Sequence, residues 1–384
     1  MEATAGTDPA STSTDGFQLE LPGHPFGVVV SRDGRWVFVA VMSEKAGASG
    51  VAVIQQDQGR YELKRVVPCE GAAELALTHD GKILVVAAGD SVGLLDTGRM
   101  ISGTGDPHMG AFSDGAGAGS IYVNVTRDDK VLFVSDEGAE AITVIDLDRV
   151  RSSGYDARAV IGKIPVGRAP IALTFSPDDR LLYTTSEIAA EAWEWPKTVK
   201  SENSDPGLPS PMVQEGAVVV IDVAQAKADP AHSVLTRVPA GGSPVRMVMS
   251  PDGRLIYVTA RGSNAVLVFD AAKLVTDPGH ARLAKVPVVV SPVPLAIIQN
   301  GRTLVVGNSN RFGSDAGAFQ KLSVLDIARM GRDDAVTGTI KAGIFPREMC
   351  ISADGKTLFL TNFNSDSLQV IDAQNPPIES RQDR

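Results

Sequence analysis

The sequence is poor in the features that mark membrane, disulfide-rich and nucleic-acid-binding proteins. Its 384 residues include no apolar run close to the roughly 20 residues that a membrane-spanning helix requires. Only two cysteines are present, Cys69 and Cys350, and their spacing establishes no disulfide, so cysteine usage leaves the cellular compartment open. The 36 Lys and Arg against 46 Asp and Glu give a net charge of −10, which argues against tight nonspecific binding to nucleic acid.

Common catalytic and metal-binding motifs are also missing. The five histidines form no HxH or HxxxH spacing, so the sequence predicts no zinc site, and it indicates no other metal or cofactor. There is no GxSxG motif and no Cys/His nucleophile pattern. The glycine-rich stretch 115–119 lacks the Lys-Ser/Thr ending and the following helix of a phosphate-binding loop, so we interpret it as a flexible linker.

What the sequence does contain is a repeat, which is clearest between Val245 and Asp270. An apolar run there ends at Asp252-Gly253, a second β-rich run follows, and a turn at residues 262–264 leads into a third run. An Asp-Gly pair between two such runs predicts a β-hairpin, because both turn residues tolerate positive φ. The unit therefore predicts a three-stranded antiparallel meander.

Two markers repeat this unit along the chain, and the turns that form the first marker are mostly 47 to 54 residues apart. The first is the hairpin turn, found at Asp33-Gly34, Asp80-Gly81, Asp128-Asp129, Asp178-Asp179, Asp252-Gly253, Asn300-Gly301 and Asp354-Gly355. The second is an apolar-Asp pair that ends the third strand, found at Leu95-Asp96, Ile145-Asp146, Ile221-Asp222, Phe269-Asp270, Leu325-Asp326 and Ile371-Asp372. A period of this length with about four strands per unit predicts an all-β, seven-bladed β-propeller of four-stranded antiparallel blades.

The two ends of the repeat predict how the ring closes. Residues 17–21 form a short alternating strand before the first complete unit, whereas the last unit, 344–372, has only three strands. We therefore expect the N-terminal strand to join the last blade and remove the open edges of the ring. The predicted domains are a disordered leader or tether at 1–15, a single propeller at 16–375 and a C-terminal tail at 376–384. Residues 2–15 have no signal-peptide pattern, so a leader and a tether that has lost its export signal both fit them.

An aspartate at the end of several third strands predicts a second local feature. Helix-like turns follow it at residues 146–150, 270–274 and 326–330. An aspartate in this position accepts backbone N–H bonds as a helix N-cap, so we expect a structural role for these carboxylates.

Insertions predict where function lies on this scaffold. The longest, residues 43–50, 187–215 and 311–320, fall between the second and third strands of blades one, four and six. In a propeller these loops share a face with the loops that start the inner strands, and loops on a rigid scaffold commonly carry function. We therefore expect a site at the tunnel mouth on this face, which we call the insertion face.

The start of each inner strand supplies the first candidate site residues. The aligned positions are Gly27, Glu74, Tyr122, Ala172, Arg246, Ala296 and Glu348. Arg246 and the neighbouring Arg347 are candidates for binding a carboxylate or phosphate, because guanidinium groups make bidentate pairs. Glu74 and Glu348 are candidate general bases and Arg246 is the third tentative catalytic residue, while Tyr122 is a candidate for ligand binding.

Loops around the predicted mouth supply the other candidates for ligand binding. They are His24, Glu187, Trp193, Trp195, Arg261, Asn308, Asn310, Asn362 and Asn364. A polar ring of this kind fits an anion, a polyol or a metal, but it also fits a water-filled mouth, and asparagine favours left-handed turns. The two tryptophans fit either a lid over the tunnel or a hydrophobic contact beneath a long loop.

Several units resemble a known family. Ser250-Pro251-Asp252-Gly253 with Tyr257-Val258-Thr259-Ala260, and again Leu360-Thr361-Asn362, are similar to the YVTN-repeat propellers. The resemblance spans residues 17–374 and implies the YncE-like and lactonase-like seven-bladed group. Its members are often bacterial and extracytoplasmic, which implies a periplasmic or secreted protein, with a cytoplasmic one as the alternative. Some members hydrolyse sugar-type lactones or cyclise muconates with His, Arg and Glu at the tunnel mouth, whereas others bind ligands or partners without catalysis.

Two functional hypotheses follow. The main one is a monomeric propeller that binds a small molecule or a protein partner at the insertion face, with no nucleic-acid partner and no membrane span. The alternative is a lactonase-type hydrolase for a sugar-type or acidic lactone. In that case Arg246 and Arg347 would bind the acidic substrate or stabilise an oxyanion, and Glu348 or Glu74 would activate water.

Overall fold

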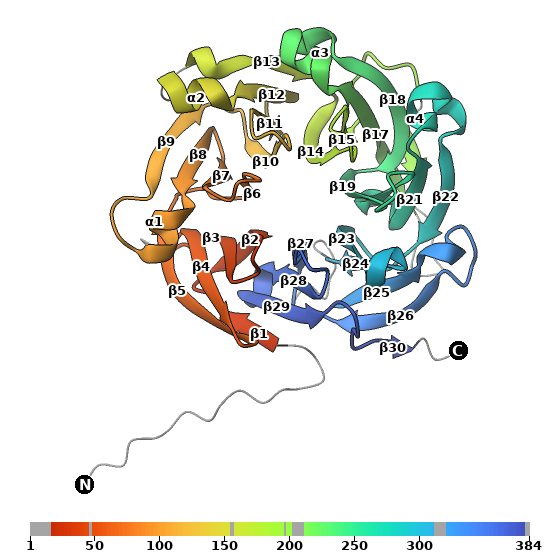
Figure 1. Cartoon of the computed structure of the whole chain (residues 1–384). Helices are drawn as coiled ribbons and strands as arrows, with labels where there is room; N and C mark the ends of the chain where they lie inside the picture. Colours follow the sequence, from red (N-terminus) through yellow and green to blue (C-terminus); the bar gives the residue numbers. More distant parts are fainter. Residues whose placement is uncertain are drawn as a thin grey trace.

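Seven small sheets stand in a ring around a central axis (Figure 1). The computed structural model of the chain describes residues 17–45, 48–153, 157–195, 197–201, 211–310 and 320–380. Every sheet is built of antiparallel pairs, and the strands of a blade follow one another from the centre outward. The fold is therefore the predicted all-β, seven-bladed propeller.

The inner two strands of each blade carry the apolar runs of the repeat. The inner strands are β2 (His24–Val30), β6 (Leu75–Leu77), β10 (Ser120–Val125), β14 (Arg168–Phe175), β19 (Pro244–Met249), β23 (Pro292–Ile298) and β27 (Pro346–Ile351). The second strands are β3 (Trp36–Met42), β7 (Ile83–Ala88), β11 (Val131–Asp136), β15 (Leu181–Ile188), β20 (Leu255–Ala260), β24 (Thr303–Asn308) and β28 (Thr357–Asn362).

The outer two strands complete each blade. The third strands are β4 (Gly50–Asp57), β8 (Ser91–Asp96), β12 (Ala141–Asp146), β17 (Met212–Asp222), β21 (Ala265–Asp270), β25 (Lys321–Asp326) and β29 (Ser367–Asp372). The outer strands are β5 (Arg60–Pro68), β9 (His108–Ser113), β13 (Val160–Pro165), β18 (Val234–Gly242), β22 (Arg282–Pro287), β26 (Val336–Lys341) and β1 (Phe17–Glu20).

The N-terminal strand closes the ring as predicted. β1 pairs antiparallel with β29, with Phe17 opposite Val370 and Glu20 opposite Ser367. The last blade thus takes three strands from the end of the chain and one from its beginning, which covers the edge that β29 would otherwise expose. The predicted leader, residues 1–15, lies outside the described residues.

Two short strands were not predicted. β16 (Thr198–Lys200) pairs with the extended first half of β17 in blade four. β30 (Glu379–Ser380) pairs with β26, so part of the predicted C-terminal tail adds a fifth strand to blade six. Both pairings depend on which segment the fold brings alongside, which local sequence does not encode.

The turns between first and second strands, which we call the inner turns, are the predicted hairpin turns. At Asp252-Gly253 the Gly253 N–H donates to the Ser250 carbonyl oxygen (2.8 Å), and the Ser250 hydroxyl donates to the Asp252 carboxylate (2.6 Å). Gly253 has a φ of +72°, whereas Asp252 stays outside the left-handed region. The hairpin turn is present as predicted, and only its second residue adopts the positive φ that glycine favours.

Aspartate caps the segments after the third strands as expected. The Asp146 carboxylate accepts the Arg149 N–H (2.9 Å), and the Asp270 carboxylate accepts the Lys273 N–H (3.0 Å). The helices are α1 (Thr97–Ser102), α2 (Leu147–Ser153), α3 (Val223–Ala228) and α4 (Lys273–Thr276). Single 3₁₀ turns lie at Ala157–Ala159, Pro230–His232, Arg261–Ser263, Pro278–His280, Gln299–Gly301, Ile327–Arg329 and Phe363–Ser365.

The hydrophobic core lies between neighbouring blades rather than at the centre of the ring. Phe38 of blade one and Leu84 of blade two share one fully buried cluster, and Tyr257 of blade five and Leu304 of blade six share another. Burial of each such side chain contributes about 1.5–3 kcal/mol. The blades are therefore rigid walls around the central tunnel.

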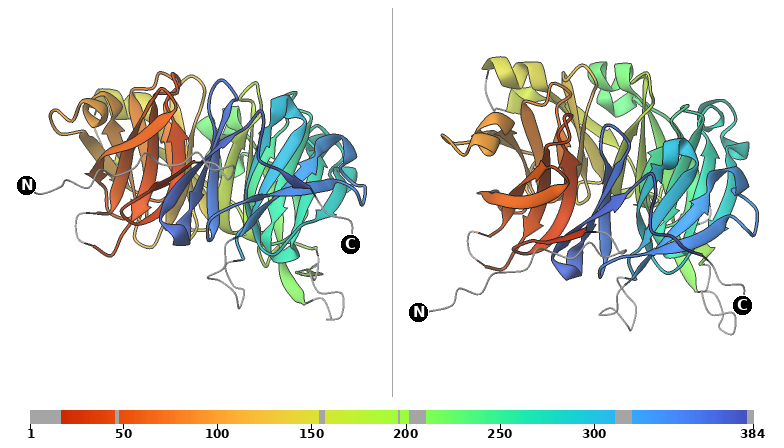
Figure 2. Two further views of the ribbon diagram at one scale, coloured as in Figure 1. Left: turned by 90° about the horizontal axis from the view of Figure 1, so that it is seen from below. Right: turned by 60° about the horizontal axis from the view of Figure 1, so that its bottom comes forward.

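The ring has two distinct faces (Figure 2). Helices α1–α4 and the inner turns lie on one face, which we call the turn face. The second-to-third-strand connections of blades one, four and six leave from the other, as predicted, since they join β3 to β4, β15 to β17 and β24 to β25. Insertion residues 46–47, 202–210 and 311–319 lie outside the described residues.

Candidate functional site

The strand register places one side chain per blade in a common ring around the tunnel. Arg246 is opposite Thr259, Glu348 is opposite Thr361, and Tyr122 is opposite Ser135. In each case an irregularity in the inner strand comes directly before this position. The equivalent residues are Gly27, Glu74, Tyr122, Ala172, Arg246, Pro294 and Glu348.

One of the seven sequence alignments was wrong. The register pairs Pro292 with Asn308 and Leu295 with Val306, so the ring position in blade six is Pro294, and Ala296 lies two residues further on. The repeated prolines at the start of β23 obscured this shift in the sequence.

Four members of the ring meet across the tunnel, and we call them the tunnel cluster. Arg246 Nε donates to Glu348 Oε2 (2.6 Å), and Arg246 Nη2 lies 3.7 Å from Glu74 Oε2. The guanidinium carbon of Arg246 lies 4.9 Å from the centre of the Tyr122 ring, in cation–π range. Blades two, three, five and seven thus each contribute one side chain to a single contact network.

The tunnel cluster is deeply buried. Arg246, Glu74 and Glu348 are 2%, 3% and 6% exposed. Burial raises the pKa of Glu74 well above its usual range, and the nearby Glu348 charge raises it further. The positive charge of Arg246 lowers it, but less strongly. Burial likewise raises the pKa of Tyr122. The cluster therefore combines the buried ion pair of Arg246 and Glu348 with a Glu74 carboxyl whose pKa is raised, beside a neutral Tyr122.

The cluster is not fully satisfied by its own members. Among the described residues, Nη1 and Nη2 of Arg246 and Oε2 of Glu74 are buried without a hydrogen-bond partner. Buried polar atoms are nearly always bonded to protein or ordered water, so such atoms need an explanation. These three atoms can bond to a ligand or to water inside the tunnel.

On the insertion side, apolar side chains adjoin the cluster. Ile171, Val245 and Val293, one from each of three consecutive blades, are buried together and pack against Tyr122. Arg347 takes the same strand position in blade seven, and its guanidinium carbon lies 3.8 Å from the centre of the Phe26 ring. Three of the side chains at this level of the tunnel are therefore apolar and pack together.

Charged residues lie further toward the insertion face. Arg261 Nη2 and Glu187 Oε2 form an ion pair at 2.6 Å, and both side chains are mostly buried. Burial raises the pKa of Glu187, while the positive charges of Arg261 and Arg347 lower it. Glu187, Arg261 and Arg347 are thus close enough to interact at this mouth.

Two of the candidate asparagines lie inside their own blades. Asn308 Nδ2 donates to the Lys321 carbonyl oxygen (2.8 Å), and Asn362 Oδ1 accepts the Gly343 N–H (3.1 Å). Both side chains are buried. Their contacts hold the second strand to neighbouring strands and loops of the same blade.

Asn310, Asn364 and His24 occupy loop positions. Asn310 has a φ of +41°, and the Asn364 N–H donates to the Ile344 carbonyl oxygen (3.1 Å). His24 stacks on Phe363 with ring centres 4.8 Å apart, and its Nδ1 lies 2.7 Å from Asp366 Oδ1. The His24 contacts join blade one to blade seven. None of these contacts brings His24, Asn310 or Asn364 to the tunnel cluster.

The tryptophans pack against the seam between blades three and four. The ring centres of Trp193 and Trp195 are 4.9 Å apart, and both rings contact a buried cluster that includes Ile142 and Val219. Arg237 of the outer strand lies over Trp193 at 5.3 Å. The contacts correspond to a satellite hydrophobic cluster beneath the long loop.

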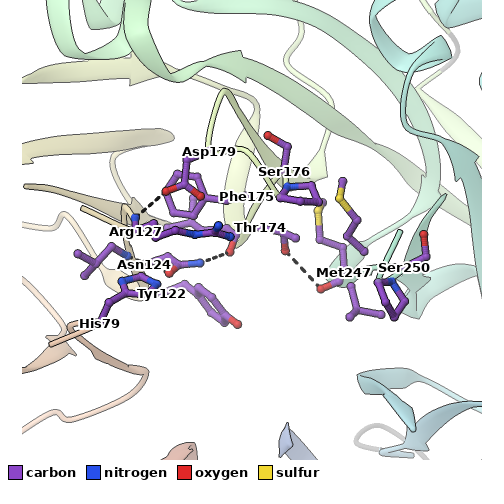
Figure 3. A pocket seen from close by; sticks show the side chains of 16 residues that line it. His79, Tyr122, Asn124, Arg127, Thr174, Phe175, Ser176, Asp179, Met247 and Ser250 are labelled. Atoms are coloured by element: carbon purple, nitrogen blue, oxygen red, sulfur yellow. Dashed lines mark hydrogen bonds between the residues drawn. The ribbon is translucent and has the colours of Figure 1, made fainter. Parts of the chain in front are cut away.

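A cavity of about 500 Å³ lies at the other end of the tunnel, on the turn face (Figure 3). Blades two to five line it, and Tyr122 belongs to both this pocket and the tunnel cluster. This pocket was not predicted from the sequence. The available signal was Asn124 and Thr174, two polar side chains placed two residues after the ring positions of β10 and β14.

No metal or membrane feature adds to these sites. Among the residues that the structure describes, no group of three or more His, Cys, Asp or Glu side chains converges in a way that would hold a metal ion. None of the helices in the same described ranges is long and apolar enough to cross a membrane.

Comparisons with known proteins agree with the fold. Residues 118–280 match the family described as "Lactonase, 7-bladed beta-propeller", a segment that includes Tyr122 and Arg246 but neither Glu74 nor Glu348. No curated protein matches the chain. A structure titled "Kuenenia stuttgartiensis Hydrazine Synthase" is similar at 19% identity and a TM-score of 0.63, covering 96% of this chain and 99% of that one.

A chain from "Crystal Structure of Mitotic Checkpoint Complex" is similar at 15% identity and a TM-score of 0.66, covering 98% of this chain and 100% of that one. Identities this low show the fold alone. The family match over residues 118–280 and the seven-bladed ring together support a lactonase-like seven-bladed β-propeller.

Proposed function

We propose that the protein is a small-molecule-binding propeller whose ligand contacts Arg246 in the central tunnel. The observation that carries the proposal is the pair of buried Arg246 nitrogens, Nη1 and Nη2, that have no hydrogen-bond partner among the described residues. Two parallel guanidinium N–H groups match a carboxylate, and they also match the carbonyl oxygen of a lactone. A sugar acid or sugar lactone is therefore the ligand class that fits best.

The insertion face supports approach from that side. Glu187, Arg261 and Arg347 form a charged rim there, within range of one another. Ile171 and Val245 lie between this rim and Arg246 and would contact the apolar edge of a ligand. A slender molecule with one acidic or carbonyl group suits this arrangement better than a bulky one.

A lactonase activity is the second candidate, favoured by the family match over residues 118–280. In that reaction water adds to the lactone carbonyl carbon, the ring C–O bond breaks, and the ring oxygen takes a proton to give a hydroxy acid. Arg246 would stabilise the oxyanion, and Glu348 or Glu74 would accept the proton of water. Glu348 Oε2 is already bonded to Arg246, and burial raises the pKa of Glu74 so that this carboxyl ionises less readily, so ligand binding has the stronger support.

One panel of sugar acids and sugar lactones tests both candidates. Calorimetric titration follows binding of the acids, and acid release follows hydrolysis of the lactones. At least one acid should bind the wild type and bind Arg246→Lys about tenfold more weakly, because lysine presents a point charge in place of the planar fork. Arg254→Ala is the matched control, since Arg254 lies on the turn face with its side chain 82% exposed.

The outcomes separate the two candidates. Binding without acid release supports the ligand-binding role. Acid release that is lost in Glu348→Gln and kept in Arg254→Ala supports the hydrolase instead. Equal affinity of wild type and Arg246→Lys for every acid that binds would contradict the proposed role of Arg246.

A further inference from the structure

We infer that the pocket on the turn face is a second binding site, one that takes a small carboxylate with an apolar or aromatic body. It lies at the opposite end of the tunnel from the charged rim of the insertion face (Figure 3). The inference does not depend on the proposed function, because the pocket lining does not include Arg246, Glu74 or Glu348. Its volume of about 500 Å³ is in the range of small-molecule sites.

Adaptable apolar side chains make up part of the pocket wall, beside polar ones such as Asn124 and Thr174. Met247 and Met249 of β19 line one side, and Leu173 and Phe175 of β14 line the neighbouring side. Methionine side chains adjust to the shape of a ligand, and their sulfur atoms make favourable contacts with aromatic rings. These walls suit a flat apolar body such as a phenyl ring.

The inner end of the pocket offers one free polar group. Asn124 Nδ2 already donates to the Leu173 carbonyl oxygen (2.9 Å), and Thr174 Oγ1 donates to the Met247 carbonyl oxygen (3.4 Å). The Tyr122 hydroxyl forms no hydrogen bond within the described ranges. It keeps its proton at neutral pH, since burial raises its pKa, so it can donate to a ligand oxygen.

The rim of the pocket favours a negative ligand group. Arg127 is exposed there, and its guanidinium forms no ion pair with a carboxylate of the described residues. Asp179 is on the same rim, but its Oδ2 accepts the Arg127 backbone N–H (2.6 Å). His79 is held by Asp129, whose Oδ1 lies 3.0 Å from the imidazole Nδ1. The Arg127 guanidinium is therefore available to a ligand, whereas the Asp129 and Asp179 carboxylates already accept hydrogen bonds.

Three probes of one size test this inference by calorimetric titration. Phenylacetate carries the ring and the acid, phenylacetamide carries the ring without charge, and phenethylamine carries the ring with the opposite charge. Phenylacetate should bind, and both other probes should bind about tenfold more weakly, because neither offers a carboxylate for a charge-assisted hydrogen bond. Arg127→Gln should weaken phenylacetate binding by the same factor and leave phenylacetamide binding unchanged.

Two further variants fix the location. Thr174→Phe fills the pocket and should abolish binding of phenylacetate, whereas Arg180→Gln is the control, since Arg180 follows the neighbouring inner turn and does not line the pocket. Arg246→Lys should leave phenylacetate binding unchanged, so loss of the tunnel function and loss of this site are distinguishable.

Each contrary result would overturn the inference. Absence of saturable phenylacetate binding at millimolar concentrations would remove the site. Stronger binding of phenethylamine would reverse its charge preference. Phenylacetate binding that survives Thr174→Phe, or that is lost in Arg246→Lys and kept in Arg127→Gln, would place the ligand elsewhere in the tunnel.

Discussion

At the scale of single residues, two inner turns carry an aspartate with positive φ where other blades carry glycine. Asp129 and Asp179 both have a φ of +56°. A left-handed backbone costs a non-glycine residue of order 1 kcal/mol. The carboxylates offset this cost by reaching the preceding blade. Asp129 accepts the backbone N–H groups of His79 (2.7 Å) and Asp80 (2.9 Å). The departure from Asp-Gly in these two turns is thus a link between blades.

This link predicts a stability change for Asp129→Asn. Asparagine tolerates the same left-handed backbone but removes the charge from the hydrogen bonds, so the free energy of unfolding should fall by about 1–2 kcal/mol. Urea unfolding measures the change, with Asp57→Asn as the control, because Asp57 is exposed at the end of β4. An equal effect of both substitutions would show that the inter-blade link contributes nothing.

The buried ion pair predicts a non-additive effect. Arg246→Met leaves the Glu348 charge buried and unpaired, so it should lower the free energy of unfolding by about 3–5 kcal/mol. Adding Glu348→Gln removes that charge and should recover part of the loss. The double variant in urea unfolding is the measurement. Losses that simply add would mean that the two side chains are not coupled, despite their 2.6 Å contact.

A second carboxyl pair lies between blades two and three. Asp114 and Asp136 are both buried, and the Ser120 hydroxyl lies 2.8 Å from Asp114 Oδ2 and 3.1 Å from Asp136 Oδ1. Lys163 Nζ lies 2.9 Å from Asp136 Oδ2 and neutralises that carboxylate. Burial raises the pKa of Asp114, and the Asp136 charge raises it further, to about 6.

This pair predicts a pH-dependent contribution to stability. The folded pKa lies above the ordinary value of 3.8, so the folded protein holds this proton more tightly than the unfolded chain does. The resulting stabilisation is complete below pH 3.8 and lost as the pH rises through 6, by up to about 3 kcal/mol. Asp114→Asn cannot ionise, so its free energy of unfolding does not fall through this titration. Between pH 4 and pH 8 the free energy of unfolding of the variant should therefore rise relative to that of the wild type by about this amount. A constant difference in urea unfolding across this range would contradict the assignment.

At the scale of elements, the short pairing of β1 with β29 closes the ring. Four residues provide it, and the Leu21 N–H adds a hydrogen bond to the Asp366 carbonyl oxygen (2.7 Å). A chain that starts after residue 20 would leave the β29 edge open. We expect a lower thermal midpoint and concentration-dependent aggregation for it, measured by circular dichroism and light scattering. A chain that starts at residue 16 keeps β1 and is the control; identical behaviour of the two would contradict the closure role.

The elements also show what local sequence can predict. Hairpin turns and aspartate caps were predictable because neighbouring residues determine them, as at Ser250–Gly253 and Asp146. Pairing between distant segments was predictable only where a blade lacked a strand, which located β1. Blade six already has four strands, so the sequence did not predict a partner for β30. Its pairing with β26 is known from the structure alone.

At the scale of the whole molecule, the repeat determined the fold because each unit buries its core against its neighbours. The tunnel cluster was partly predictable, since the same repeat aligned Glu74, Arg246 and Glu348. The hydrogen bonds among them depend on rotamers across the tunnel, which the repeat does not encode. The turn-face pocket was missed because the prediction considered the insertion-face mouth of the tunnel, whereas inner strands and inner turns line the pocket at the opposite end. The Asn308 and Asn362 side chains turned inward to satisfy buried backbone groups, which spacing alone does not reveal.

The central claim is that Arg246 receives a ligand oxygen within the tunnel, and one measurement tests it most directly. A high-resolution crystal structure is determined after soaking with the sugar acid that binds most tightly in titration. We predict that an oxygen of the acid lies within hydrogen-bond distance of Arg246 Nη1 or Nη2, with Glu348 still bonded to Nε. A structure in which ordered water alone fills those positions, with the acid bound elsewhere, would contradict the claim.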